Sequence, residues 1–249
     1  MTIKLAVILA AGMGTRLKEL GVSRPKGFLQ LGDHPIIIES ITKLLNSGTE
    51  RIVIVTGHLA KFYEGLKTHY SQITTIHNPL YATSGSMYSL YCARELIDAD
   101  FLLLESDLIY EQRAISIAIK FPQNNVVILS GKTNAGDEVY VETSGDTITA
   151  MSKNFSNLTH LPTGELVGIC KISLPLFERM IDYAKTQFTR TLKVDYETNA
   201  LVGVAQSYPV HYTLIPDLLW AEIDTTNHLS RAKEQVYPNI GVAELRYDD

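Results

Sequence analysis

The chain has 249 residues, and its 22 basic and 27 acidic side chains give a net charge of −5 at pH 7. This length suffices for one large α/β domain or two small ones, and the acidic balance argues against a nucleic-acid backbone or an anionic membrane as the main partner. The two cysteines, Cys92 and Cys170, lie in apolar surroundings, which argues against a disulfide framework or a cysteine-based zinc site. The N-terminus lacks the layout of a signal peptide and no apolar run approaches the ~20 residues of a membrane helix, so we expect a cytoplasmic protein.

Strand-like and helix-like patterns alternate through the first half of the chain. Buried apolar runs predict strands, and apolar residues at helical spacing predict helices. This alternation predicts an α/β fold with a mainly parallel sheet covered by helices on both faces. The predicted strands are 3–9, 51–56, 73–77, 101–104 and 126–129, and the predicted helices are 36–46, 59–68, 86–96 and 111–120.

The second half changes to shorter strands joined by turns. The turn Ser144-Gly145-Asp146 predicts a hairpin. Because no linker, repeat or low-complexity tract occurs, we expect a single domain over 1–249, with a first half at 1–135 and a β-rich second half at 136–249. The predicted elements of the second half are the hairpin strands 139–141 and 148–151, a strand at 165–172, a helix at 175–187, a tract at 195–204, a strand at 208–215, a short strand ending at Ile223, a helix at 226–236 and a polar tail from Val242.

The first predicted strand runs directly into a glycine-rich loop, residues 12–16, and Lys26 follows a short loop later. Two glycines spaced Gly-x-Gly let the backbone turn sharply and approach a ligand, and the freed N–H groups can point at anionic oxygens. Arg16 and Lys26 add positive charge and Thr15 a hydroxyl, so a polyphosphate would satisfy the whole loop. A plain structural turn is the alternative. A dinucleotide fingerprint would need a glycine where Leu17 stands, and the Gly-Lys-Ser/Thr of a P-loop is absent.

Two aspartates follow predicted strands, at the strand ends where ligands bind in α/β sheets. Asp107 follows the run FLLLE at 101–105, and Asp224 follows LLWAEI at 218–223. Carboxylate oxygens are the protein ligands that Mg²⁺ takes. Asp224 also precedes Thr225-Thr226-Asn227, so it equally suits the N-cap of the last helix.

Residues 5–32, LAVILAAGMGTRLKELGVSRPKGFLQLG, resemble the signature of the nucleoside-triphosphate-dependent sugar-1-phosphate and alkyl-phosphate nucleotidyltransferases, L-A-A-G-x-G-x-R followed by P-K. Within that superfamily the chain is most similar to the bacterial 2-aminoethylphosphonate and phosphocholine cytidylyltransferases. The resemblance implies a Rossmann-like nucleotidyltransferase domain with the nucleotide in its first half and the acceptor in its second. It implies Mg²⁺-dependent transfer of CMP from CTP to 2-aminoethylphosphonate, with release of pyrophosphate, in phosphonate biosynthesis. Phosphocholine is the close alternative acceptor.

The resemblance also implies roles for individual residues. Lys26 would lie against the transferring phosphoryl group and Arg16 would bind the leaving β- and γ-phosphates, while Asp107 and Asp224 would hold the metal. Glu105 departs from the pattern, because many relatives carry a small residue there. No general base is needed, since the attacking oxygen is already ionised near neutral pH.

A polar loop at 77–87 lies between a predicted strand and the helix at 86–96. Its amides and hydroxyls can read a base edge, and relatives use the corresponding segment to line the nucleoside pocket. Ser84 or Ser86 equally suits the N-cap of the helix. The predicted nucleotide-binding residues are Leu9, Ala10, Ala11, Gly12, Gly14, Thr15, Arg16, Lys26, Asn78, Ser84, Gly85 and Ser86.

The acceptor site is less well defined by the sequence. A primary ammonium needs carboxylates or other oxygen acceptors, whereas a quaternary ammonium is held by aromatic faces. The segments GELVGI at 164–169 and LLWAEID at 218–224 resemble the aminoethylphosphonate enzymes. Any of the aromatic candidates can equally belong to the core, and Lys153 can be a solvated surface lysine. The candidate acceptor-binding residues are Lys153, Glu165, Asp195, Tyr196, Glu197 and Trp220.

The expected partners are CTP and a small zwitterionic phosphonate or phosphate ester, with no nucleic acid and no membrane; a homodimer is also allowed. Other functions stay open. A sugar-1-phosphate nucleotidyltransferase using UTP or dTTP is disfavoured by the short chain. A non-catalytic nucleotide sensor is disfavoured because Lys26, Asp107 and Asp224 are all intact, and a dinucleotide-binding dehydrogenase is disfavoured by Leu17.

Overall fold

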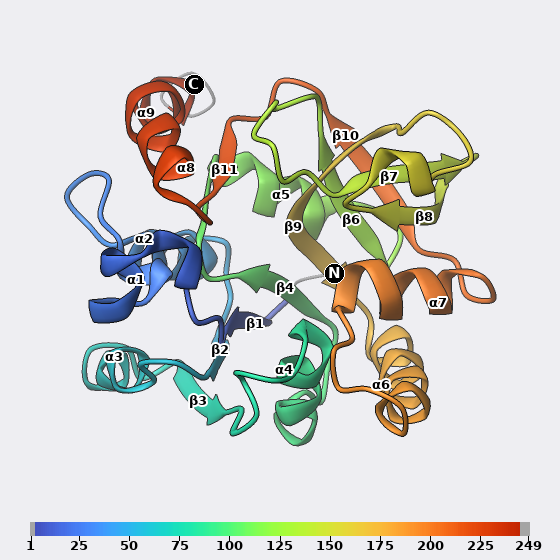
Figure 1. Cartoon of the computed structure of the whole chain (residues 1–249), viewed down its shortest axis with the longest axis horizontal. Coiled ribbons are helices and arrows are strands. Elements are labelled where there is room, and N and C mark those ends of the chain that lie inside the picture. Colours follow the sequence, from blue (N-terminus) through green and yellow to red (C-terminus); the bar gives the residue numbers. More distant parts are fainter. Residues whose placement is uncertain (1–2, 245–249) are drawn as a thin grey trace.

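The structure is a computed structural model that describes residues 3–244. Within these residues the strands form a nine-stranded mixed sheet and a separate two-stranded sheet (Figure 1). The strands are β1 (Leu5–Ala10), β2 (Arg51–Thr56), β3 (Ile73–His77), β4 (Phe101–Glu105), β5 (Leu108–Tyr110), β6 (Val126–Ser130), β7 (Tyr140–Ser144), β8 (Thr147–Ser152), β9 (Gly164–Ile172), β10 (His211–Ile215) and β11 (Trp220–Glu222).

The large sheet has the strand order β3-β2-β1-β4-β9-β6-β10-β8-β7. Parallel pairing is found among β3, β2, β1 and β4, and between β6 and β10. The strand β9 runs antiparallel to both β4 and β6, and β7 and β8 form the expected hairpin. The expected mixed α/β sheet is therefore confirmed, with the parallel pairs concentrated in the first half and the antiparallel pairs in the β-rich second half.

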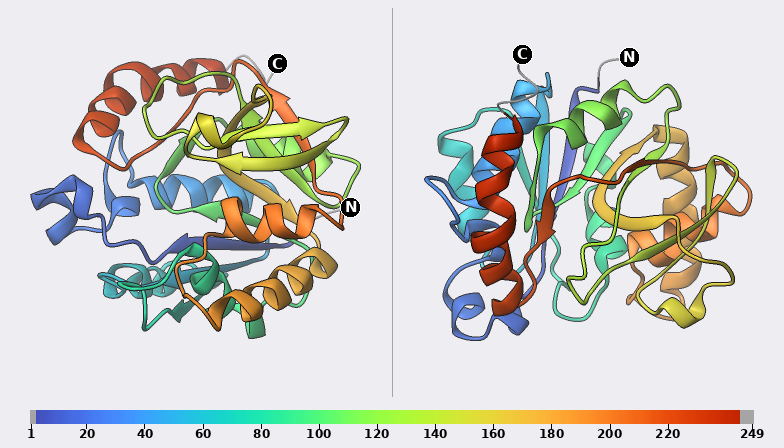
Figure 2. Two further views of the ribbon diagram at one scale, coloured as in Figure 1. Left: turned by 45° about the vertical axis from the view of Figure 1, so that its right-hand side comes forward. Right: turned by 90° about the horizontal axis from the view of Figure 1, so that it is seen from above.

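Helices cover both faces of the sheet (Figure 2). Successive side chains of β1 point to opposite faces: Leu5, Val7 and Leu9 join one core with α4, α6 and α7, while Ala6 and Ile8 join the other with α2, α3 and α5. The helices are α1 (Glu19–Ser23), α2 (Ile36–Asn46), α3 (Lys61–Glu64), α4 (Ser86–Cys92), α5 (Gln112–Lys120), α6 (Leu174–Phe188), α7 (Val202–Ala205), α8 (Thr226–Arg231) and α9 (Tyr237–Glu244), with short helical turns at Thr15–Leu17, Lys26–Phe28, Gly65–Thr68, Arg94–Leu96, Phe155–Asn157, Tyr196–Leu201 and Ala232–Val236.

Most local predictions agree with these bounds, and the differences have local causes. The helix predicted over 59–68 is the short α3 followed by a 3₁₀ turn, and the tract at 195–204 is helical. The elements α1 and β5 were not predicted, because five and three residues are too few for a periodic pattern. The tail predicted from Val242 is wrong as far as Glu244, which still belongs to α9; residues 245–249 lie outside the described part of the chain.

A small third core joins the C-terminal helices to the rest of the domain. It contains Ile109 of β5 and Ala221 of β11, packed with Ala232, Val236 and Ile240 from the last helical segments. This core fixes the two-stranded sheet beside the end of β4 and thereby fixes the residues that follow β11. Among residues 3–244, no helix has the length and apolar content needed to cross a membrane.

Candidate active site

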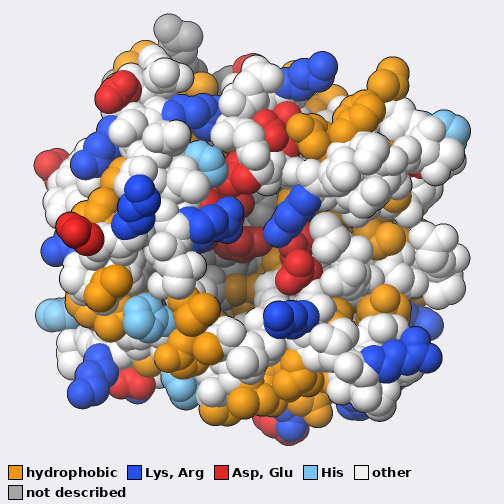
Figure 3. Space-filling model, in the orientation of Figure 1, with side chains coloured by type: hydrophobic (Ala, Val, Ile, Leu, Met, Phe, Trp, Pro, Cys, Tyr) orange, Lys and Arg blue, Asp and Glu red, His pale blue; other side chains and the backbone are white. Residues whose placement is uncertain are grey.

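A cavity of about 180 Å³ opens beyond the carboxyl ends of β1 and β4. Figure 3 shows this face of the molecule hollowed at its centre, with acidic side chains gathered inside the hollow and basic side chains around it. The cavity combines the glycine loop, the segment after β4 and the polar loop before α4. Its lining residues are Leu9, Ala10, Ala11, Gly12, Lys26, Tyr63, Tyr81, Ser84, Gly85, Ser86, Ser89, Glu105, Ser106 and Asp107.

The glycine loop presents backbone to this cavity. Gly14 has φ +63°, a left-handed conformation that glycine adopts without steric cost, and it is the point where the chain turns. Gly12 faces open space, since a Cβ there would meet nothing within 4 Å. Thr15 and Arg16 follow in a 3₁₀ turn, and the Arg16 side chain is 60% exposed. The loop therefore leaves its backbone and the exposed Arg16 guanidinium accessible to a ligand.

Lys26 lies between the two aspartates that follow strands. Its Nζ is 2.7 Å from Oδ2 of Asp107 and also hydrogen-bonds to Oδ1 of Asp224, whose Oδ2 accepts a 2.6 Å hydrogen bond from Arg16. Burial lowers the pKa of Lys26, but the attraction of Asp107 and Asp224 outweighs it and holds that pKa above its usual value. Burial raises the pKa of Asp224, but Lys26 and Arg16 bring it below its usual value. At neutral pH the lysine is therefore cationic and Asp224 anionic.

The two-stranded sheet explains why Asp107 and Asp224 meet although 117 positions separate them in the numbering. β11 pairs antiparallel with β5, with Glu222 opposite Leu108, and the Ile223 N–H donates to the Asp107 carbonyl at 3.1 Å. Asp224 is not the N-cap of α8: Thr225 takes that position and accepts from the His228 N–H. The capping alternative for Asp224 is thus wrong, and its carboxylate is available to the cations.

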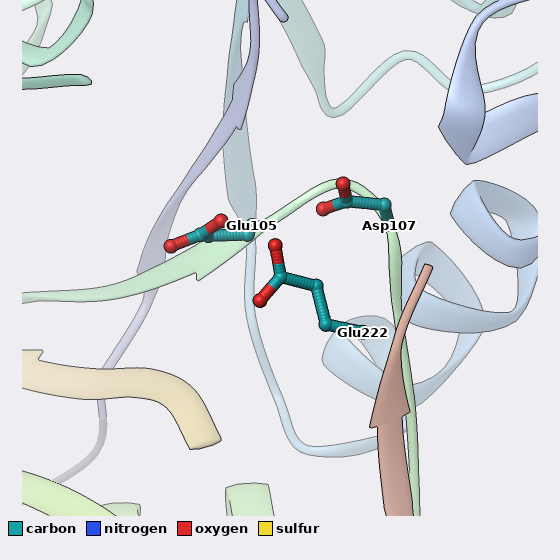
Figure 4. A group of neighbouring side chains, drawn as sticks. All are labelled: Glu105, Asp107 and Glu222. Carbon is teal, nitrogen blue, oxygen red and sulfur yellow. The ribbon is translucent and has the colours of Figure 1, made fainter. Parts of the chain in front are cut away.

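A second set of carboxylates extends the site. Figure 4 shows Glu105, Asp107 and Glu222 close together at β4, the following loop and β11. One carboxylate oxygen of each residue lies within 4.8 Å of one oxygen of each of the other two. Glu222 also belongs to a group with Asp137 and Asp224. Burial, and then the charges of Glu197 and Asp107, raise the pKa of Glu105 to about 8. The site thus carries more potential negative charge than its lysine balances.

The polar loop before α4 is held by its own hydrogen bonds. The Asn78 amide donates to Ser84 Oγ and to Ser89 Oγ, each at 3.0 Å, and its oxygen accepts from the Leu80 N–H, so Asn78 supports the lining from behind. Neither predicted serine caps the helix: Gly85 is the N-cap residue, and no side chain bonds there. Ser86 instead accepts from the Tyr196 N–H and donates to Glu197.

The predicted acceptor residues separate into two groups. The Tyr196 hydroxyl donates to Glu105 Oε1 at 3.1 Å, and Lys153 Nζ lies 3.8 Å from Glu197, so Tyr196, Glu197 and Lys153 adjoin the cavity. Asp195 directly precedes Tyr196, and its charge helps to raise the pKa of Glu197. The others lie elsewhere among the described residues: Glu165 accepts from the Thr133 N–H and hydroxyl, and the Trp220 indole donates to Ser130 Oγ at 2.7 Å.

Residues 6–142 match the family described as the MobA-like NTP transferase domain, which is more than half of the chain. The chain belongs to this family.

The chain is also similar to individual NTP transferases. It is 28% identical to the 2-aminoethylphosphonate cytidylyltransferase of Lancefieldella rimae over 75% of this chain and 74% of that protein. It is 36% identical to the choline-phosphate cytidylyltransferase of Streptococcus pneumoniae, over 41% of this chain and 46% of that protein. The match spans between a fifth and about half of the length of several curated relatives. The inositol-1-phosphate CTP transferase of T. maritima has the same fold, with a TM-score of 0.82 at 18% identity, covering 97% of this chain and 96% of that one.

The acidic residues of this site suit a divalent cation that prefers oxygen ligands, such as Mg²⁺. Glu105, Asp107 and Glu222 form one group of carboxylates, and Asp137, Glu222 and Asp224 form a second group that shares Glu222 with the first; carboxylate oxygens are the donors that Mg²⁺ takes. Lys26 already places one positive charge between Asp107 and Asp224, which shows that these carboxylates are arranged around a cation. The residues present therefore fit the metal that the sequence predicts.

Several residues of this NTP transferase site were not singled out by the sequence. Glu222 stands two residues before Asp224 in a strand, so the period-2 pattern could have placed it on the same face. His228 has its Nδ1 3.2 Å from Asp137 Oδ2. Its position four residues after Asp224, about one helical turn, was the only sign in the sequence that it lies near the site. Tyr63 and Ser106 gave no sequence signal, because their place in the site depends on which helix packs beneath the lysine.

Replacing Glu105 with glutamine is expected to change how stability depends on pH. In the folded wild type the pKa of Glu105, about 8, lies above its value in the unfolded chain, so folding takes up a proton; the resulting stability is lost as the pH rises through 8. Glu105→Gln keeps the side chain neutral, and its free energy of unfolding should exceed that of wild type by about 1–3 kcal/mol near pH 9 and converge with it near pH 5.

The measurement is urea unfolding from pH 5 to pH 9 in EDTA, with Glu178→Gln on the exposed face of α6 as the matched control. Parallel pH curves for wild type and Glu105→Gln would show that Glu105 is ionised throughout.

Proposed function

We propose that the chain is a Mg²⁺-dependent cytidylyltransferase that converts CTP and 2-aminoethylphosphonate to CMP-2-aminoethylphosphonate and pyrophosphate. The observation that carries this proposal is the position of Lys26, buried between Asp107 and Asp224 at the mouth of a cavity whose other wall is the backbone of the glycine loop. A buried cation beside exposed backbone N–H groups suits a triphosphate. The paired carboxylates suit the metal that accompanies it.

The reaction follows from the charges at this site. An ionised phosphonate oxygen attacks the α-phosphorus of CTP; a P–O bond forms, and the bond to the bridging oxygen breaks with its electron pair leaving on pyrophosphate. Lys26 stabilises the charge that builds on the transferring phosphoryl group, and Arg16, which is exposed and paired with Asp224, binds the departing phosphates. Mg²⁺ held by Asp107 and Asp224 would supply further positive charge to the triphosphate.

The residues next to the cavity favour an acceptor with a primary ammonium group. Glu197 is only 5% exposed and lies between Ser86 and Lys153, and Glu105 stands beside it through Tyr196. The Glu197 carboxylate, when ionised, can accept short, charge-assisted hydrogen bonds, and the Glu105 carboxyl, with its pKa of about 8, can accept through its carbonyl oxygen while neutral; a primary ammonium donates such bonds and a quaternary one cannot. Trp220, the only tryptophan, is buried in the core, where its indole N–H donates to Ser130 Oγ. The strongest aromatic candidate for a choline cage is therefore not available at the cavity.

The deciding experiment measures pyrophosphate release with Mg²⁺ for CTP, UTP, ATP and GTP against 2-aminoethylphosphonate, phosphocholine and glucose 1-phosphate. We expect release with CTP and 2-aminoethylphosphonate alone. Phosphocholine is the second candidate acceptor, because the S. pneumoniae choline-phosphate enzyme has the higher identity over its shorter match. Release with phosphocholine would select that acceptor, and no release with any pair would reject the transferase.

Glu197→Gln is expected to weaken the binding of the acceptor and to leave the binding of CTP unchanged. The substitution removes a charged hydrogen-bond acceptor and keeps its shape, so KM for 2-aminoethylphosphonate should rise by about 10- to 100-fold while KM for CTP stays within about twofold. Steady-state kinetics with each substrate varied in turn gives both constants, with Glu178→Gln again as the control. Equal rises in both KM values would place Glu197 outside the ammonium site.

A further inference from the structure

Tyr63 is a buried residue of α3 whose side chain reaches the floor of the candidate active site. It is 1% exposed and lines the cavity, and its ring packs edge-on against Phe28 with centroids 5.1 Å apart. Phe62, its neighbour in α3, packs against the same ring at 5.2 Å. The short helix α3 thus packs against Phe28 of the turn Lys26–Phe28, which carries the lysine of the site.

The Tyr63 hydroxyl contacts two segments of the site at once. Both the Gly27 backbone N–H and the Ser106 side chain face it and act on it as hydrogen-bond partners. Gly27 directly follows Lys26, and Ser106 directly precedes Asp107. A single phenol oxygen is therefore shared between the segment that carries the lysine and the segment that carries the aspartate.

Gly27 shows how closely these two segments approach. A Cβ at this position would lie 2.8 Å from the Ser106 carbonyl oxygen and 3.0 Å from the Tyr63 hydroxyl, which leaves no room for a side chain. The approach brings the Lys26 ammonium to 2.7 Å from the Asp107 carboxylate. Gly27, in the triplet Pro25-Lys26-Gly27, therefore allows the two segments to approach this closely, and the Tyr63 hydroxyl lies against both of them.

We propose that Tyr63 is a positioning residue that holds Lys26 and Asp107 at a fixed separation for the transfer reaction. Tyr63 is 1% exposed, and in this proposal it acts through Gly27 and Ser106 rather than on the substrate. Because Lys26 and Asp107 act on the same phosphoryl group in the proposed function, on which this inference rests, a small loss of alignment lowers the rate without weakening the binding of the triphosphate.

The test compares Tyr63→Phe with Tyr70→Phe. Both variants lose one phenol oxygen, but Tyr70 is a partly buried tyrosine just beyond α3 that packs on the same core without lining the cavity. For Tyr63→Phe we expect kcat to fall about tenfold, the effect of losing one hydrogen bond in the transition state, with KM for CTP within about twofold; Tyr70→Phe should match wild type. An unchanged kcat, or a rise in KM alone, would overturn the proposal.

A double-mutant cycle tests whether the hydroxyl acts through Ser106. If Tyr63 and Ser106 form one unit, Tyr63→Phe with Ser106→Ala should cost little more in kcat than either single change, whereas independent roles would multiply the two losses. Multiplied losses would overturn the shared contact.

Amide hydrogen exchange gives a readout that does not depend on turnover. The Gly27 N–H, bonded to Tyr63 in the wild type, should exchange about fivefold to tenfold faster in Tyr63→Phe and at the wild-type rate in Tyr70→Phe. Equal exchange in all three proteins would overturn the proposal. If the wild type releases no pyrophosphate, the proposed function fails, yet the exchange rates still decide whether Tyr63 fixes this segment.

Discussion

Asp107→Asn is expected to lower kcat/KM for pyrophosphate release by on the order of 10³, with the fold retained. Asp107 is 6% exposed, hydrogen-bonds to Lys26 at 2.7 Å and shares the carboxylate groups that suit the metal. Asparagine keeps the size of the side chain and one oxygen but removes the negative charge that binds a divalent cation. The loss should therefore appear in catalysis while the free energy of unfolding changes little, because Lys26 keeps its bond to Asp224.

The control for this prediction is Asp98→Asn, which removes an aspartate that is 67% exposed and paired with Arg51 far from the cavity. Activity is measured over a range of Mg²⁺ concentrations, and stability by thermal unfolding in EDTA. If excess Mg²⁺ restored Asp107→Asn to the wild-type rate, the carboxylate would serve metal affinity alone. Near-full activity at all Mg²⁺ concentrations would remove Asp107 from the mechanism.

Much of the fold could be predicted from the sequence because its strands are buried and its helices amphipathic. The strand at 51–56 and the helix at 36–46 have the predicted bounds, since the strand is a continuous apolar run that ends before Gly57 and the helix has apolar residues at helical spacing that end before Gly48. The direction of β9 could not be predicted in the same way. It is buried on both faces, so its residues show the continuous apolar run that parallel strands also show, and only its neighbours in the sheet reveal that it is antiparallel.

The site could be predicted where function depends on local backbone and could not where it depends on tertiary contact. The lysine, the glycine loop and both aspartates carry their signal in nearby residues, and the structure brings them together. Trp220 shows the opposite case: its aromatic ring, in the segment LLWAEID, suggested the acceptor site, but the ring packs in the core and its indole N–H donates to Ser130 Oγ.

Lys26→Met is expected to lower kcat by about 10²–10³ while changing KM for CTP only a few-fold, because the lysine stabilises charge that develops mainly in the transition state. Its side chain is 16% exposed, compared with 60% for Arg16, so little solvent screens its field. Steady-state kinetics of pyrophosphate release separates the two constants. A change in KM alone would make Lys26 a ground-state binder of the triphosphate.

The same substitution should also destabilise the protein, in a way that reports on the aspartates. Methionine leaves Asp107 and Asp224 facing each other without the ammonium, and breaking such a pair should cost up to about 3 kcal/mol of unfolding free energy. The stability that Lys26 gives to ionised Asp224 is present above the ordinary aspartate pKa of 3.8 and is lost as the pH falls through the lower pKa of folded Asp224, so the deficit should shrink only below about pH 4. The double variant Lys26→Met/Asp224→Asn should recover stability at pH 7 but not activity. If the double variant recovered neither stability nor activity, the lost stability would come from packing of the lysine stem. If Lys26→Arg kept full turnover, the reaction would need only a positive charge and not the position of Nζ between the two carboxylates.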